Sequence, residues 1–285
     1  MRNIILFVFM VLASQSFNAN ACDAEGKTGF MPENNMSVAV GDKSANDMTE
    51  ERFNAIIDRV ETVYAPIVRS KKGKLVLKRK WSDNTVNASA SRFLTTWTVN
   101  MYGGLARHAD VTDDGFALVI CHELGHHLGG APKVGNFMMK WASNEGQSDY
   151  FGSLKCMRRV FGNDDNVTII STMNVPDYAQ KKCLASWSTQ AEQALCIRIA
   201  MAGKSLSKLL SRSGTPTFST PDSSVVGRTN NAHPAGQCRL DTYFHGALCD
   251  KEVSDDVSNR DRTKGVCVRK RGYKTGSRPL CWYKP

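Results

Sequence analysis

Residues 121–130 read CHELGHHLGG and directly follow an apolar run, FALVI, at residues 116–120. Together they predict one helix with a metal-binding face, because residues four apart in a helix lie one turn above each other. His122 and His126 therefore present two imidazoles to one point, which suits a tetrahedral zinc ion. Glu123 lies one position round the helix, where its carboxylate can take a proton from a water at the metal.

A third zinc ligand is predicted in the stretch SNEGQSDYFG at residues 143–152, which can open a second helix capped by Ser143 or Asn144. Glu145 and Asp149 are again four residues apart, so both carboxylates face the same way. Glu145 can complete a His-His-Glu ligand set and leave the fourth position open for water, as in catalytic zinc sites. Asp149 can then hydrogen-bond the back nitrogen of a ligating histidine and fix its tautomer.

These two motifs resemble those of the gluzincin (thermolysin-like) metallopeptidases. The second helix of that family carries Asn-Glu-x-x-Ser-Asp-x-Phe-Gly, and residues 144–152 meet every specified position. The resemblance implies an α+β zincin-type catalytic domain with two metal-ligand helices and a small sheet. It also implies a sheet edge just before the metal helix, and residues 93–105 are placed either to bind an extended substrate or to be a purely structural edge. A metzincin is excluded because it would need a third histidine where this chain has Pro132.

A third motif consists of His233 and Pro234, followed after four residues by Arg239. It resembles a motif of the CAAX prenyl protease and heat-shock membrane protease family, in which the histidine and arginine lie near the zinc. The likeness is a set of motifs over roughly residues 99–239, and the chain lacks that family's membrane spans, so it resembles their soluble exported relatives. The likeness implies that His233, aided by Arg239, stabilises the transition-state oxyanion. Taken alone, a loop histidine before a proline would have a structural role.

The N-terminus and the cysteines predict an exported protein. Residues 1–21 have a basic residue, an apolar core and an Ala-x-Ala cleavage site before Cys22, as in a signal peptide. The mature chain is expected to be secreted or periplasmic, where cysteines form disulfides. Nine cysteines is an odd number, so at least one is not in an internal pair. The candidates are Cys121, as a buried free thiol, and Cys22, through which a lipid anchor is less expected because Ala19 stands where a lipobox prefers Leu.

We expect a signal peptide at residues 1–21, a zinc metallopeptidase domain at 22–237 and a disulfide-rich C-terminal extension at 238–285. After position 260 the extension has eight Lys or Arg residues against one acidic residue. The whole chain has a net charge of +10 and a pI near 9.2. The basic end is therefore a candidate for binding an anionic surface polymer, with ordinary solvated charge as the alternative.

The sequence thus predicts an exported zinc endopeptidase acting on a protein or peptide. His122, His126 and Glu145 hold the zinc, and Glu123 carries the proton from water to the leaving amine. A zinc amidase that cuts cell-wall peptide cross-links is a rival, since the same groups cleave any amide. A polymer-binding protein with a vestigial zinc site is an alternative of a different class. Metal-dependent digestion of casein would separate the peptidase from the binding protein, and release of peptides from purified cell wall would indicate the amidase.

Overall fold

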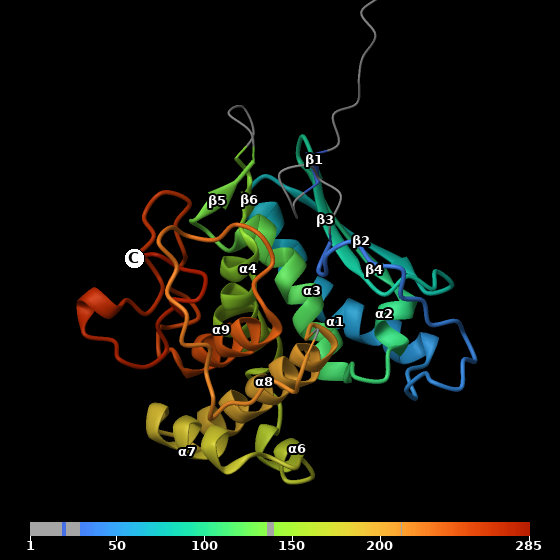
Figure 1. Cartoon of the computed structure of the whole chain (residues 1–285). Helices are drawn as coiled ribbons and strands as arrows, with labels where there is room; N and C mark the ends of the chain where they lie inside the picture. Colours follow the sequence, from blue (N-terminus) through green and yellow to red (C-terminus); the bar gives the residue numbers. More distant parts are fainter. Residues whose placement is uncertain (1–18, 21–28, 136–139, 212) are drawn as a thin grey trace, which may run out of the picture.

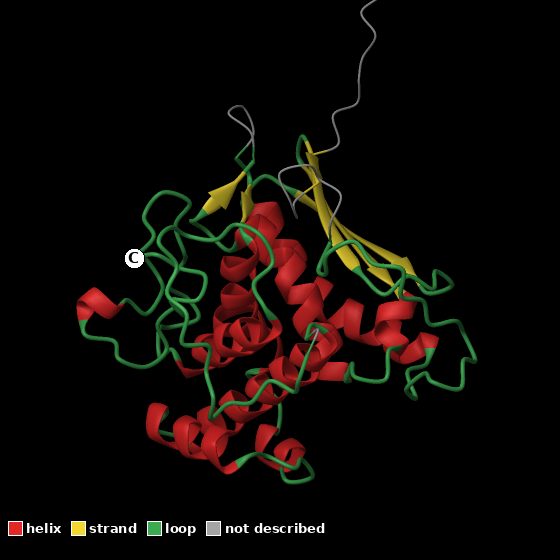
Figure 2. Ribbon diagram, in the orientation of Figure 1, coloured by secondary structure: helices red, strands yellow, loops and turns green. Residues whose placement is uncertain are grey.

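The computed structural model describes residues 19–20, 29–135, 140–211 and 213–285, and it confirms the α+β class (Figure 1, Figure 2). A small sheet lies on one side of the central helix α3 (Asp113–Leu128), and further helices pack on its other side. The other helical elements are α1 (Glu50–Ser70), α2 (Gly103–Arg107), α4 (Glu145–Phe151), the π-helical η1 (Gly152–Met157), α5 (Arg158–Phe161), α6 (Asn166–Ile170), α7 (Asp177–Ser186), α8 (Gln190–Leu209), α9 (Gly236–Leu248) and the 3-10 helix η2 (Arg269–Arg271). The strands are β1 (Ala19–Asn20), β2 (Lys74–Lys80), β3 (Ala88–Phe93), β4 (Thr96–Tyr102), β5 (Lys133–Val134) and β6 (Ala142–Ser143).

The larger sheet of the described chain has the strand order β1-β3-β4-β2. β3 and β4 form an antiparallel hairpin, and β2 runs parallel to β4. The expectation that residues 93–105 supply a sheet edge is wrong, because β4 is paired on both sides and residues 103–105 already belong to α2. The edge strands of this sheet are β2 and the two-residue β1, which pairs with β3 opposite Arg92 and Ser91.

Helix α3 is the centre of the core. The Thr112 side chain accepts a hydrogen bond from the Gly115 backbone N–H and so caps the helix, with two aspartates in its first turn. Every residue from Gly115 to His127 is buried. A helix that is apolar all round is typical of a core position, and its polar residues there must find partners inside the protein.

The predicted second ligand helix begins at Glu145, and α4, η1 and α5 follow one another from there to Phe161. Its N-cap is Asn144, whose side chain accepts from the Gln147 backbone N–H. α4 lies very close to α3, since a Cβ on Gly125 would stand 2.8 Å from the Cα of Ser148. Glycine inside the His-Glu-x-x-His motif therefore lets the two ligand helices approach each other.

The C-terminal residues pack on this same helix. The boundary expected between residues 237 and 238 falls inside α9, which packs against α8 and α4. Trp282 is fully buried, and its ring lies where a Cβ on Gly146 would be, with 2.2 Å to the nearest ring atom. The C-terminal segment thus forms one wall around α4.

Eight cysteines form four disulfides, which confirms the expected disulfide chemistry: Cys121–Cys156, Cys183–Cys196, Cys238–Cys281 and Cys249–Cys267. Cys121 as a free thiol is therefore wrong: it crosslinks α3 to η1, because the two Cα atoms face each other 5.5 Å apart across the packed helices. Cys22 lies outside the described residues, as does the predicted signal peptide apart from β1. Within the described residues, no helix is long and apolar enough to cross a membrane.

Gly125→Ala should destabilise the protein by about 1–2 kcal/mol in urea denaturation. The added methyl group meets Ser148 backbone atoms that cannot move independently, an overpacking of about 1–3 kcal/mol that the better helix propensity of alanine offsets only in part. Gly152→Ala is the matched control, because its Cβ meets only the end of the Leu118 side chain, at 3.1 Å. If the two variants are equally stable, close approach at Gly125 does not limit the packing of α3 on α4.

Candidate metal centre

Helix α3 brings two histidines to one point in the middle of the protein. The rings of His122 and His126 lie 4.8 Å apart between centroids and perpendicular to each other. Both side chains are fully buried. The geometry is the one expected from residues four apart on one helical face.

Glu145, the first residue of α4, faces both histidines. Its Oε2 lies 3.3 Å from Nε2 of His122, and its Oε1 lies 3.7 Å from Nε2 of His126. The carboxylate oxygens of Glu145 and Nε2 of His122 are buried and form no hydrogen bond with any residue that the structure describes. Buried polar atoms of this kind normally have partners, and a cation shared by the three side chains would satisfy them.

The three side chains offer ligand atoms that all lie within 4.8 Å of one another, so this group could bind a metal ion. Among the described residues two other groups of acidic and cysteine side chains are equally compact, around Cys238–Cys281 and Cys249–Cys267. Their cysteines are joined in disulfides and cannot act as thiolates. The His-His-Glu group is the better candidate.

The back nitrogens of both histidines are fixed. Nδ1 of His122 lies 2.7 Å from Oδ1 of Asp149, and Nδ1 of His126 lies 2.8 Å from the Ser143 carbonyl oxygen. Because these oxygens accept, the hydrogen-bond network assigns the proton of each ring to Nδ1 and leaves the Nε2 lone pair facing Glu145. Asp149 therefore occupies the orienting position predicted for it.

Arg239 lies behind Asp149, on the side away from Glu145. Its Nε donates to Oδ2 of Asp149 at 2.8 Å and one terminal nitrogen donates to Oδ1 at 2.7 Å, a bidentate pair. It also donates to the Phe30 carbonyl oxygen and to the Tyr243 hydroxyl. Burial alone would raise the pKa of Asp149, but Arg239 and His122 hold it well below its usual value. The structure thus places Arg239 on Asp149, whereas the sequence placed it beside His233 at the oxyanion.

Glu123 lies beside the candidate ligands. Its side chain is fully buried, and neither carboxylate oxygen has a hydrogen-bond partner within the described part of the chain. Burial raises its pKa to about 8; the charge of His122 opposes the rise, and those of Glu145 and Asp149 add to it. A carboxyl group with a pKa in this range can both accept and release a proton near neutral pH.

His233 comes from the loop before α9 and reaches the same cluster. Its Nε2 lies 3.4 Å from Oε2 of Glu145 and 2.8 Å from the carbonyl oxygen of Gly29. Since a carbonyl only accepts, the proton of this ring is on Nε2. A substrate oxygen would have to take the place of the Gly29 carbonyl to receive that proton in a hydrogen bond.

Several contacts around the centre were not predicted from the sequence. Tyr243 binds Arg239 from four residues further along α9, a spacing that could have indicated the contact. Phe30 meets the His122 ring edge-on with centroids 5.2 Å apart, and it comes from an irregular segment that carries no periodic signal. Ser143 contributes through its backbone, which no side-chain pattern reveals.

Comparison with known proteins gave no match. No family model, no curated protein and no solved structure is similar to this chain. The residues of the site are therefore the basis for any functional inference.

Arg239→Leu should lower the free energy of unfolding of the metal-free protein by about 3–5 kcal/mol, because it leaves Asp149 as a buried carboxylate without its cation. The measurement is urea denaturation followed by circular dichroism. Arg79→Leu is the control: Arg79 also contacts two carboxylates, Asp58 and Glu61, but at the surface, where such pairs contribute about 1 kcal/mol or less. Equal losses in the two variants would contradict the buried-pair account.

Proposed function

We propose that the protein is a zinc-dependent endopeptidase with a zincin-type catalytic domain, exported from the cell. The observation that carries the proposal is the buried His122–His126–Glu145 group with an unpaired Glu123 carboxylate beside it. Two neutral imidazoles and one carboxylate are the donor set of catalytic zinc sites that keep a fourth position open. Zinc in such a site polarises a carbonyl oxygen and lowers the pKa of water towards about 7.

In this proposal Glu123 is the proton carrier. Its carboxylate takes a proton from the attacking water and passes it to the nitrogen of the leaving amine. The absence of any hydrogen bond to Glu123 from the described residues leaves both oxygens available for this transfer. Asp149 and Arg239 act indirectly, through His122. Asp149 holds the His122 ring in its orientation and tautomer, and Arg239 holds Asp149.

His233 is proposed as the donor to the oxyanion that forms on the substrate. Its Nε2 lies 3.4 Å from Oε2 of Glu145, and its N–H donates to the Gly29 carbonyl oxygen, whose place a substrate oxygen would take. A donor placed where charge develops stabilises the transition state more than the bound substrate. Since His122, Glu123 and Glu145 are buried, substrate entry requires the segment at Gly29 to move away from His233.

That burial also favours a second candidate, in which the metal has a structural role and the protein binds a polymer. Of the eight basic residues after position 260, Arg278 is buried and donates to Gln147 of α4. The other seven are exposed, so binding of an anionic polymer by this end stays a prediction.

Glu123→Gln separates the two candidates. The variant should keep about one zinc per chain and the wild-type stability, while hydrolysis of casein falls by about 10²–10⁴-fold, the usual contribution of a general base. Glu145→Gln is the matched control, since it should lower the zinc content itself. Zinc content is measured by mass spectrometry of the metal and turnover by release of soluble peptides. Casein hydrolysis at the wild-type rate by zinc-loaded Glu123→Gln would refute the assignment, and no zinc-dependent hydrolysis by the wild type would favour the structural role.

A further inference from the structure

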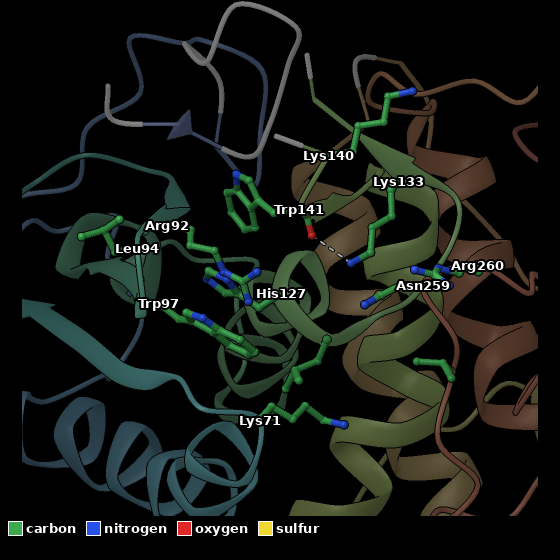
Figure 3. Close-up of a pocket in the computed structure, with 12 residues that line it drawn as sticks. Lys71, Arg92, Leu94, Trp97, His127, Lys133, Lys140, Trp141, Asn259 and Arg260 are labelled. Atoms are coloured by element: carbon green, nitrogen blue, oxygen red, sulfur yellow. Dashed lines mark hydrogen bonds between the residues drawn. The ribbon is translucent and has the colours of Figure 1, made fainter. Parts of the chain in front are cut away.

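A pocket of about 890 Å³ has a strongly basic lining (Figure 3). One lining residue is His127, the chain neighbour of the candidate ligand His126. Five of its twelve lining residues are lysine or arginine and none is acidic: Lys71, Arg92, Lys133, Lys140 and Arg260. They come from segments far apart in the chain, so their convergence is a property of the fold. Such a concentration of one sign of charge attracts an anionic ligand.

Arg92, on β3, is a partly buried cation of this pocket with no acidic partner among the described residues. Its guanidinium carbon lies 3.8 Å from the centre of the Trp97 ring and 5.4 Å from that of Trp141. No described residue forms a hydrogen bond or an ion pair with its side chain, and its Nε is buried without a partner. Burial lowers its pKa to about 10. A guanidinium that stacks on aromatic rings and lacks an acceptor is suited to bind a carboxylate along its edge.

The wall beside Arg92 is held in place by aromatic stacking. The His127 ring is stacked on Trp97, 8° from parallel, and on Trp141, 25° from parallel. In Figure 3 these rings and Arg92 lie together on one side of the pocket, with Lys133 across from them. A preformed wall of this kind lowers the entropy lost when a ligand binds.

Lys133 connects the pocket to the metal centre. Its Nζ donates to the Trp141 carbonyl oxygen at 2.9 Å and to Oγ of Ser143 at 3.3 Å, and the carbonyl of Ser143 holds His126. Burial, and to a lesser extent the charge of Arg92, lower the pKa of Lys133 to about 7. Lys71, by contrast, forms an ion pair with Asp256 at 3.2 Å. Arg92 and Lys133 are thus buried more deeply than the other cations of the pocket and have no acidic partner among the described residues.

An extended peptide can reach Arg92 by pairing with the outer edge of β3. In the structure Ala19 and Asn20 pair with Arg92 and Ser91 on the outer edge of that strand. A substrate segment that paired there would carry a side chain past the Arg92 guanidinium.

From these observations we propose that the basic pocket is a substrate subsite that binds an acidic side chain of the peptide, with its carboxylate on Arg92. The subsite gives the protein a preference for acidic peptide segments. This inference rests on the proposed peptidase function, because it takes the pocket to serve the neighbouring metal centre.

The test compares two series of fluorogenic peptides. In one series a single Glu is placed at each position of the peptide in turn, and in the other series Gln takes its place. At one position the wild type should cut the Glu peptide about 10–100-fold faster in kcat/KM, the range expected of a charge-assisted hydrogen bond. Arg92→Gln should bring this ratio close to 1, and Arg260→Gln, a change of an exposed residue that preserves folding, should reduce it partly. Arg79→Gln, on the remote face of β2, should keep the wild-type ratio. A ratio near 1 at all positions in the wild type would overturn the proposal.

Binding gives a readout that does not depend on turnover. Fluorescence anisotropy with the Glu123→Gln protein should show that it binds the labelled Glu peptide about 10-fold or more tightly than the Gln peptide, and that Arg92→Gln removes the difference. Equal binding of the two peptides, or binding of an anionic polysaccharide but not of the Glu peptide, would overturn the proposal. Arg92-dependent binding without any hydrolysis by the wild type would support the pocket and refute the peptidase function. Hydrolysis of casein with no preference for Glu would support the peptidase function and refute the role of the pocket.

Discussion

A buried chain of polar and charged groups, from Glu145 through His122 and Asp149 to Arg239, is the constraint on which the rest of the structure depends. Each of these four side chains is at most 1% exposed. Charges at that depth are tolerated only when they are paired and hydrogen-bonded. Because the four residues come from α3, α4 and α9, satisfying them fixes how these three helices pack. Stability and the candidate chemistry of the site therefore rest on the same contacts.

The packing around this cluster holds its side chains in position. Gly125 allows α4 to approach α3, and the Cys121–Cys156 disulfide ties α3 to η1 one residue away from His122. On the far side of α4, Trp282 packs on Gly146 and Arg278 donates to Gln147. The C-terminal segment, which the cysteine spacing predicted as an appendage, thus supports the helix that carries Glu145.

The sequence predicted the parts of the site that depend on spacing within one helix. His122 with His126, and Glu145 with Asp149, follow from residues four apart on a helical face, and the structure brings all four together. Prediction from the sequence failed where the position or partner of a residue depends on its tertiary neighbours. The partner of Arg239 is set by how α9 docks on α4, the pairing of Cys121 by how α3 meets η1, and the exposed strand by the order of strands in the sheet. The basic pocket was also not foreseen, because Arg92, Lys133 and Arg260 meet only in the folded chain.

The central claim is that His122, His126 and Glu145 hold a zinc ion. X-ray absorption spectroscopy at the zinc edge of the purified protein tests it most directly, since it reports the identity and distance of the donor atoms. The account predicts about one zinc per chain, with two imidazole nitrogens and oxygen donors at about 2.0–2.2 Å. In Glu145→Ala the zinc content should fall. Sulfur donors at about 2.3 Å, or no stoichiometric zinc in the wild type, would contradict it.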